Sequence, residues 1–174
     1  MSFSSEDVKR LRDLTGAGML DCKNALHEAD GDFETAKEVL RKRGFEAAAR
    51  RAERSTAEGV VHSYIHHNRR LGALVEVNCE SDFVARTEDF KKLTQQIALQ
   101  VAAANPLYIS ADEIADGAEG NPEELCLLEQ PFVQDESRTI RDLLSEVISK
   151  TGENIRVRRF ARFELGRYGD GATS

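Results

Sequence analysis

Three of the four histidines and one of the three cysteines lie close enough in the sequence to suggest a metal site or nucleophilic chemistry. His62, His66 and His67 lie within a short segment, and Cys79 follows at the end of the next apolar run. This spacing is that of a β-hairpin and differs from the closed four-ligand cages that hold zinc. Cys79 also lacks the glycine-rich oxyanion turn that would accompany a nucleophile. We therefore expect solvated turn histidines here, with no metal and no catalytic residue.

A glycine-containing segment at residues 15–18 could suggest a phosphate-binding loop. It lacks the lysine and the preceding strand that such a loop needs, so a turn between two helices is the better interpretation. Gly16 and Gly18 still allow another backbone to approach closely. Met19 and Leu20 are consecutive and cannot both face one small core. One of them is predicted to be displayed as an apolar anchor for a partner.

A polar corner at residues 78–86 separates a strand-like run from a long helical pattern. Ser81 and Asp82 can accept hydrogen bonds from the free N–H groups of the next turn or helix. Phe83 is the unusual member of this corner. Its ring either packs inward beneath the turn or projects outward as a rigid knob, and the residue pattern leaves both open, although aromatic side chains are more often buried.

The sequence Asn78-Cys79-Glu80-Ser81-Asp82-Phe83-Val84 resembles the Thr-Asp-Phe-Val signature of the elongation factor Ts family, with Ser81 at the threonine position. Residues 11–23 resemble the N-terminal signature of the same family, with Leu20 where methionine is more usual. Residues 130–133 and 159–166 are also similar, so the resemblance spans nearly the whole chain.

The resemblance implies a guanine-nucleotide exchange factor for elongation factor Tu. Phe83 would wedge between helices of the partner, and Asp82 and its turn would disturb the region that holds Mg²⁺. Such a factor needs no chemistry of its own, so the resemblance implies neither an enzyme nor a cofactor. The residues that match partner-binding positions are Ser81, Asp82, Phe83 and Val84 in the corner, and Arg12, Met19 and Leu20 in the N-terminal domain.

The composition agrees with a soluble cytoplasmic protein. The chain has 174 residues, of which 40% are hydrophobic and 32% charged. The net charge of -7 disfavours general binding to nucleic acid. Three widely spaced cysteines argue against a disulfide framework and fit a reducing compartment. Residues 1–20 lack the apolar run of a secretory signal, and the most apolar stretch is too short to span a bilayer.

Hydrophobic periodicity predicts an α+β protein with two domains. Residues 1–44 are predicted to form three short helices, the third stopping at Gly44, and resemble the ubiquitin-associated (UBA-like) three-helix fold. Residues 45–55 are predicted to be a helical linker. Residues 56–168 are predicted to form an α+β core with a three-stranded antiparallel sheet and helices on one face, and residues 169–174 a flexible tail.

The open face of this sheet is predicted to be apolar and to mediate a homodimer. Long members of the family carry the core module twice, whereas this chain has room for one, so a second copy would supply the missing half. Strict alternation also places Arg156, Arg158 and Arg162 on that face. The other residues predicted to lie on that face are Val60, His62, Tyr64, Leu74 and Phe160.

Two other functions remain compatible with the sequence. A ubiquitin-binding adaptor would use the N-terminal bundle, although fold does not fix function. An RNA-binding translation accessory would use the basic stretch at residues 41–54, although the acidic total and the lack of interleaved aromatic residues disfavour it.

Overall fold

The structure is a computed structural model that describes residues 3–114 and 120–167. Its first part is a three-helix bundle of α1 (Ser5–Thr15), α2 (Met19–Glu28) and α3 (Phe33–Arg51). Ser4 and Asp7 form a capping box at the start of α1, and Gly16 ends α1 in the left-handed conformation. The bundle has its own small core, made of Val8, Leu11, Cys22, Ala25, Leu26, Ala29, Ala36 and Leu40.

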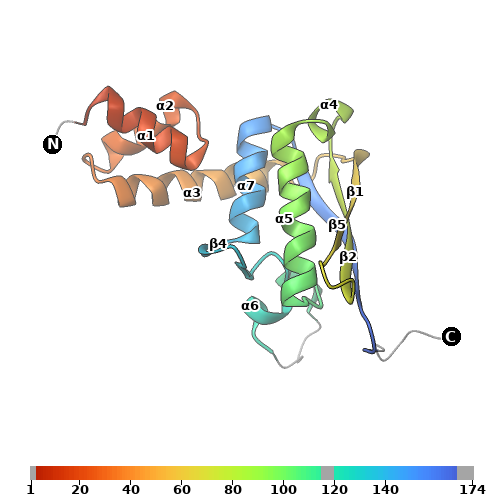
Figure 1. Ribbon diagram of the computed structural model, residues 1–174. Coiled ribbons are helices and arrows are strands. Elements are labelled where there is room, and N and C mark those ends of the chain that lie inside the picture. Colours follow the sequence, from red (N-terminus) through yellow and green to blue (C-terminus); the bar gives the residue numbers. More distant parts are fainter. Residues whose placement is uncertain (1–2, 115–119, 168–174) are drawn as a thin grey trace.

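The predicted end of the third helix at Gly44 is wrong, because α3 continues unbroken to Arg51. Figure 1 shows α3 running from the bundle past α7, so one helix belongs to both parts of the molecule. Arg41 binds Asp142 of α7 through Nε–Oδ1 at 2.7 Å. Packing against α7 therefore keeps the helix continuous at Gly44, although a glycine by itself lowers helix propensity.

The second part is an α+β core, as predicted. Strands β1 (Glu58–Ile65), β2 (Leu71–Cys79) and β5 (Ile155–Glu164) form an antiparallel sheet in the order β1-β2-β5. Helices α5 (Glu88–Ala104) and α7 (Ile140–Thr151) cover one face of the sheet (Figure 1). The largest fully buried side chains of this core are Phe90, Leu93, Ile97, Leu127, Ile140, Ile155, Val75, Val77 and Val101.

The segment between α5 and α7 contains short helical elements and a two-stranded sheet. They are a 3-10 turn (Ala111–Glu113), α6 (Pro122–Leu125), β3 (Pro131–Phe132) and β4 (Asp135–Thr139). A buried amide network attaches this segment to α5. Gln100 donates to Gln130 Oε1 at 3.1 Å and accepts from the Val133 N–H at 2.9 Å. Residues 115–119 and the predicted tail at 169–174 lie outside the described residues.

The prediction of which residues lie on each sheet face is wrong for five residues, three in β1 and two in β5. Val60 and Tyr64 pair with the buried Val77 and Ala73 of β2, so they lie on the face that the helices cover, together with His62. Both faces of β1 carry apolar residues, so alternation along this strand alone cannot assign them.

A β-bulge accounts for the other two errors. Val157 pairs with Val77 and Arg159 with Glu76, which leaves Arg158 as the extra residue of β5. The bulge reverses the facing of every later residue in the strand. Phe160 therefore packs against the core, and Arg162 donates to the Ala102 carbonyl of α5 at 2.9 Å.

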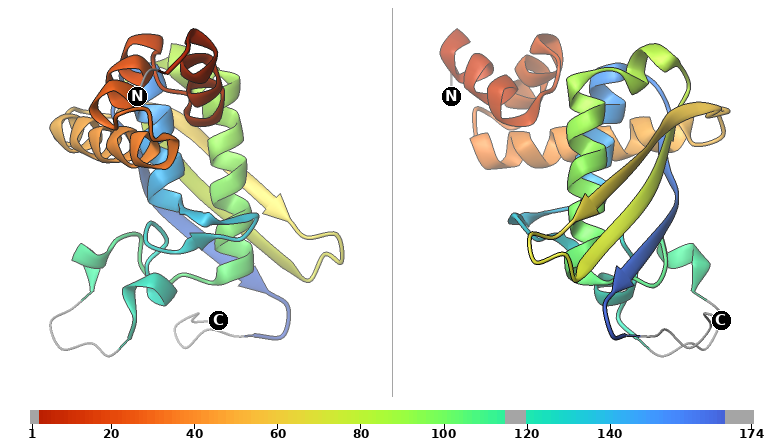
Figure 2. Two further views of the ribbon diagram at one scale, coloured as in Figure 1. Left: turned by 90° about the vertical axis from the view of Figure 1, so that its left-hand side faces the viewer. Right: turned by 45° about the vertical axis from the view of Figure 1, so that its right-hand side comes forward.

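The outer face of the sheet is nevertheless apolar. Val61, Ile65, Leu74 and Phe163 lie on it, with exposed fractions between 44% and 67%. Among the described elements, none covers this face, which comes forward in the right-hand view of Figure 2. Leu74 was correctly assigned from the sequence. Within residues 3–114 and 120–167, no helix is long and apolar enough to cross a bilayer.

Gly44→Ala is expected to stabilise the protein by about 0.5–1 kcal/mol, because alanine has a higher helix propensity than glycine in a helix interior. A Cβ at Gly44 would lie 3.6 Å from Ser149 Oγ, an ordinary contact. Gly152→Ala is the matched control and should destabilise, since Gly152 has a φ of +73°. Urea unfolding of both variants measures the effect, and a destabilised Gly44→Ala would contradict it.

Candidate partner-binding site

The polar corner joins the end of β2 to two successive helices. Ser81 begins α4 (Asp82–Ala85), and its Oγ accepts a hydrogen bond from the Val84 N–H at 3.3 Å. Thr87 then caps α5 in the same manner, accepting from the Phe90 N–H at 3.3 Å. The serine therefore caps a one-turn helix that the sequence analysis did not predict, and the long helix has its own cap.

Phe83 projects outward from this one-turn helix, with 76% of the residue exposed. Val84 points the other way and is 4% exposed, packed in the core of the sheet domain. The inward position that an aromatic ring could have taken is thus filled by Val84 and Ala85. The four residues predicted as one partner-binding set have three roles: Ser81 caps, Val84 anchors, and Asp82 and Phe83 are displayed.

Asp82 presents an exposed carboxylate beside the exposed ring. Its nearest cation is Arg86, one turn later, at 2.9 Å between Oδ2 and Nη2. A solvent-exposed pair of this kind contributes little to stability. The carboxylate is therefore available to exchange Arg86 for a partner's group.

Two residues that the sequence analysis missed hold the corner from behind. Glu153 accepts from the backbone N–H groups of Glu80 and Ser81 at 3.1 and 3.0 Å, and from Ser81 Oγ at 2.5 Å. Asn154 donates its N–H to the Glu80 carboxylate at 2.5 Å. The available signal was a Glu-Asn pair between a helix-ending glycine and a buried strand.

Cys79 is a structural thiol at the base of the corner. It is fully buried and donates to the Ser81 carbonyl at 3.1 Å. Burial raises the pKa of this thiol to about 11, and the charge of Glu153 adds to the effect. The thiol is therefore protonated at neutral pH, which disfavours a nucleophilic role.

The histidines of the hairpin turn do not lie near Cys79. The hairpin turn lies at the opposite end of β2, where Tyr64 Oη is 2.9 Å from His66 Nδ1 and the rings of His66 and His67 lie 4.1 Å apart. In the part of the chain that the structure describes, no group of three or more His, Cys, Asp or Glu residues could hold a metal ion.

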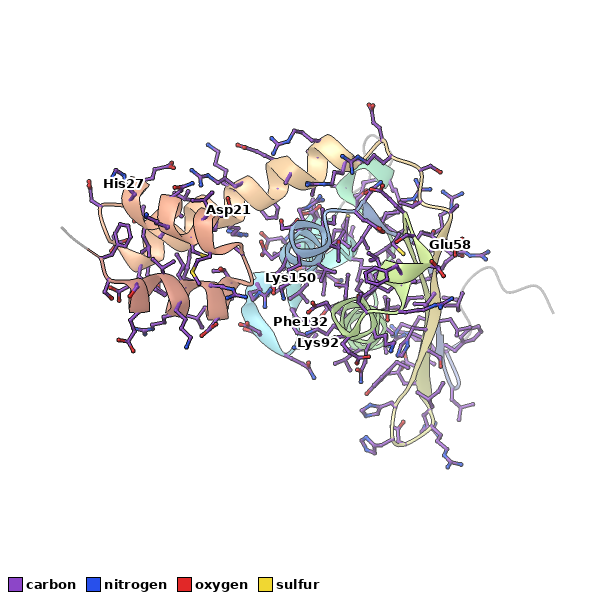
Figure 3. The ribbon with its side chains drawn as sticks, turned by 90° about the horizontal axis from the view of Figure 1, so that it is seen from above. Asp21, His27, Glu58, Lys92, Phe132 and Lys150 are labelled. Carbon is purple, nitrogen blue, oxygen red and sulfur yellow. The ribbon has the colours of Figure 1, made fainter. Side chains whose placement is uncertain are left out.

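The N-terminal candidates form a second exposed patch. Arg12 is exposed, and both Met19 and Leu20 are displayed, at 47% and 69%. Leu14, near the end of α1, is also exposed, at 60%. The adjacent turn is held by α7, because Gly16 lies against the Lys150 side chain, which extends from α7 toward the bundle (Figure 3).

The α1–α2 bundle and α4 lie at the same end of the molecule (Figure 1). Figures 1 and 2 show α4 and the α1–α2 bundle on either side of the adjoining ends of α5 and α7.

Several arginines of the basic stretch at residues 41–54 make contacts within the chain. Arg41 pairs with Asp142, Arg43 pairs with Glu28, and Arg51 donates to the Gly152 carbonyl. Arginines committed to these contacts are less available to phosphate groups, which weakens the RNA-binding alternative.

The fold and its displayed residues define a two-part α+β protein with two apolar patches suited to binding another protein. The sequence profile described as "Elongation factor TS" matches residues 21–119, which include the corner. Elongation factor Ts of Moorella thermoacetica is 47% identical over 194 aligned positions, covering 94% of this chain and 96% of that protein.

Two further relatives extend this similarity. Elongation factor Ts of Fervidobacterium nodosum is 45% identical, covering 95% of this chain and 100% of that protein. Elongation factor Ts of Acaryochloris marina is 48% identical, covering 95% of this chain and 82% of that protein. The chain belongs to the elongation factor Ts family, a family of translation elongation factors.

Phe83→Ala is expected to change the free energy of unfolding by no more than about 0.5 kcal/mol, because the ring is mostly in solvent. Val84→Ala, one residue later, should destabilise by about 2 kcal/mol through loss of buried methyl groups. Chemical unfolding of the two variants tests this contrast. Equal destabilisation by both would mean that Phe83 is part of the core.

Proposed function

We propose that this protein is the guanine-nucleotide exchange factor of elongation factor Tu and acts in the cytoplasm. The single observation that carries the proposal is a phenylalanine displayed from a capped corner whose next residue is anchored in the core. Aromatic side chains are common anchors of protein–protein interfaces, and a ring that a capped turn holds in solvent can enter a pocket of a partner. Membership of the elongation factor Ts family supports the same function.

The exchange mechanism follows from linked equilibria. A factor that binds nucleotide-free elongation factor Tu more tightly than its GDP complex must weaken GDP binding by the same ratio. Phe83 enters the partner's nucleotide-binding domain, and Asp82 disturbs the region that holds the partner's Mg²⁺. Because that ion bridges protein and nucleotide phosphates, its displacement loosens GDP. The protein supplies binding energy and needs no catalytic group or cofactor of its own.

The N-terminal patch provides a second, separate contact. Arg12, Met19 and Leu20 hold elongation factor Tu while the corner acts on the nucleotide site. Because α3 is continuous from the bundle to the core, the two contacts are joined by a stiff element. Binding at one patch therefore raises the effective concentration of the other at its site.

Phe83→Ala should slow the release of labelled GDP from elongation factor Tu strongly, with a loss of about 2–4 kcal/mol of binding to the nucleotide-free partner. Leu107→Ala is the matched control, since Leu107 is 62% exposed and lies away from both patches. The control should exchange at the wild-type rate. Undiminished release by Phe83→Ala would refute the wedge, and no acceleration by the wild type would refute the function.

We further propose that two copies associate through the outer face of the sheet. Val61, Ile65, Leu74 and Phe163 form an exposed apolar area there, which a second copy would bury by two-fold symmetry. Glu76 lies on the same face and pairs with Arg159 of its own chain, at 2.6 Å between Oε2 and Nε. Its carboxylate would therefore enter the dimer contact already paired with a cation.

Phe163→Arg and Leu74→Arg should each convert the dimer to a 19.4 kDa monomer with impaired exchange, because an arginine without a partner would be buried at the contact. Leu107→Arg, at an exposed leucine outside the sheet, should remain dimeric. Sedimentation equilibrium at micromolar concentration measures the mass. A wild type that is monomeric and fully active would rule out the dimer.

A further inference from the structure

The loop between α7 and β5 lies directly behind the corner that carries Phe83. It consists of Gly152, Glu153 and Asn154, and begins where Gly152 ends α7 in the left-handed conformation. Asn154 is 4% exposed, while Glu153 is partly buried against the corner. Neither side chain contacts solvent freely, and neither was assigned a role by the family signatures.

Toward the corner, the loop makes four hydrogen bonds that involve carboxylates. Glu153 accepts three of them, from the N–H groups of Glu80 and Ser81 and from the Ser81 hydroxyl. The fourth runs the opposite way, from the Asn154 N–H to the Glu80 carboxylate. Hydrogen bonds to an ionised group are stronger than neutral ones. Because donors of the corner bind the loop and a donor of the loop binds the corner, the two segments are held firmly together.

Away from the corner, the same loop binds the end of α3. Asn154 Nδ2 donates to the carbonyls of Ala52 and Arg54 at 3.2 and 2.8 Å, and Arg51 Nε donates to the Gly152 carbonyl at 3.0 Å. Since α3 leads directly from the N-terminal bundle, three residues connect both proposed partner-binding regions.

The corner needs this support because α4 has only four residues. One helical turn is not stable by itself. Val84 and Ala85 fix the depth of the turn in the core, but these adjacent contacts leave the tilt of the turn against the end of β2 adjustable. The carboxylate of Glu153, bound to three donors on residues 80 and 81, removes that freedom and so fixes the direction in which Phe83 points.

We propose that Glu153 is a positioning residue for nucleotide exchange, which holds the corner rigid so that Phe83 can transmit force to the partner rather than yield. The inference rests on the proposed exchange function. Misplacement of an acting group by about 1 Å can reduce a rate by about a hundredfold. Initial docking through the N-terminal patch does not depend on this rigidity.

The test measures labelled-GDP release from elongation factor Tu over a range of concentrations of each variant. Glu153→Ala should lower the maximal release rate about tenfold or more, with little change in the half-saturating concentration. Glu153→Gln should be intermediate, because its amide oxygen can still accept from both N–H groups and its amide nitrogen can donate to Ser81 Oγ, while the charge that strengthens these bonds is lost. In the free protein, amide hydrogen exchange at residues 80 and 81 should accelerate in the same order.

Glu129→Gln is the matched control. Glu129 is another partly buried glutamate, bound to Arg141 and distant in the fold from the corner, so its variant tests the general effect of removing such a carboxylate. It should leave the maximal release rate unchanged. A loss for Glu153→Ala that is matched by Glu129→Gln at equal folded fraction would overturn the positioning role.

A double-mutant cycle decides whether Glu153 acts through Phe83. In the Phe83→Ala background, Glu153→Ala should produce little further loss, because no wedge remains to be positioned. Fully additive losses would overturn the inference while leaving the exchange function intact. A wild-type protein that fails to accelerate GDP release would overturn the exchange function itself, and the positioning role with it.

Discussion

Burial of one face of the central strand β2 under α5 and α7 is the constraint on which the rest of the structure depends. Val75, Val77 and Cys79 point into this interface and are almost fully excluded from water. A shift of one residue would turn all of them to the open face, so the register of β2 is strongly specified. That register fixes where β2 ends, and therefore where Ser81 begins the turn that displays Phe83.

The corner is built as a stiff unit from weak parts. A one-turn helix, a serine cap and a valine anchor would each be marginal alone. Glu153 adds a charged acceptor for otherwise unpaired N–H groups, and Cys79 occupies the space below with a protonated thiol. An aromatic ring can then remain in solvent without folding back onto the core, which is the property that the proposed exchange function requires.

The continuous helix α3 gives the molecule its second organising feature. It contributes Ala36 and Leu40 to the small core of the bundle, and farther along Arg41 and Gly44 lie against α7. A bundle of this size has a thin core and gains stability from that contact. The same contact fixes the N-terminal patch relative to the corner, so both can engage one partner without a hinge between them.

The sequence by itself determined the elements with strong periodicity and clear ends. The long helical pattern predicted after the corner is α5, Glu88–Ala104, and the α+β class followed from the order of helices and strands. Signature residues identified the corner at residues 81–84. These features depend on neighbours in the chain, which local propensity and capping chemistry describe well.

Only the tertiary structure decided which way the critical side chains face. The bulge at Arg158 reverses the sheet face on which Phe160 and Arg162 lie. Packing against α7 keeps α3 helical through Gly44. In both places tertiary packing overrides the local sequence preference. The outward direction of Phe83 follows from Val84 filling the core beneath it. Glu153 reaches the corner from more than 70 residues away, as its contacts with Glu80 and Ser81 show, and a pairing at that separation is set by the fold and not by the chain.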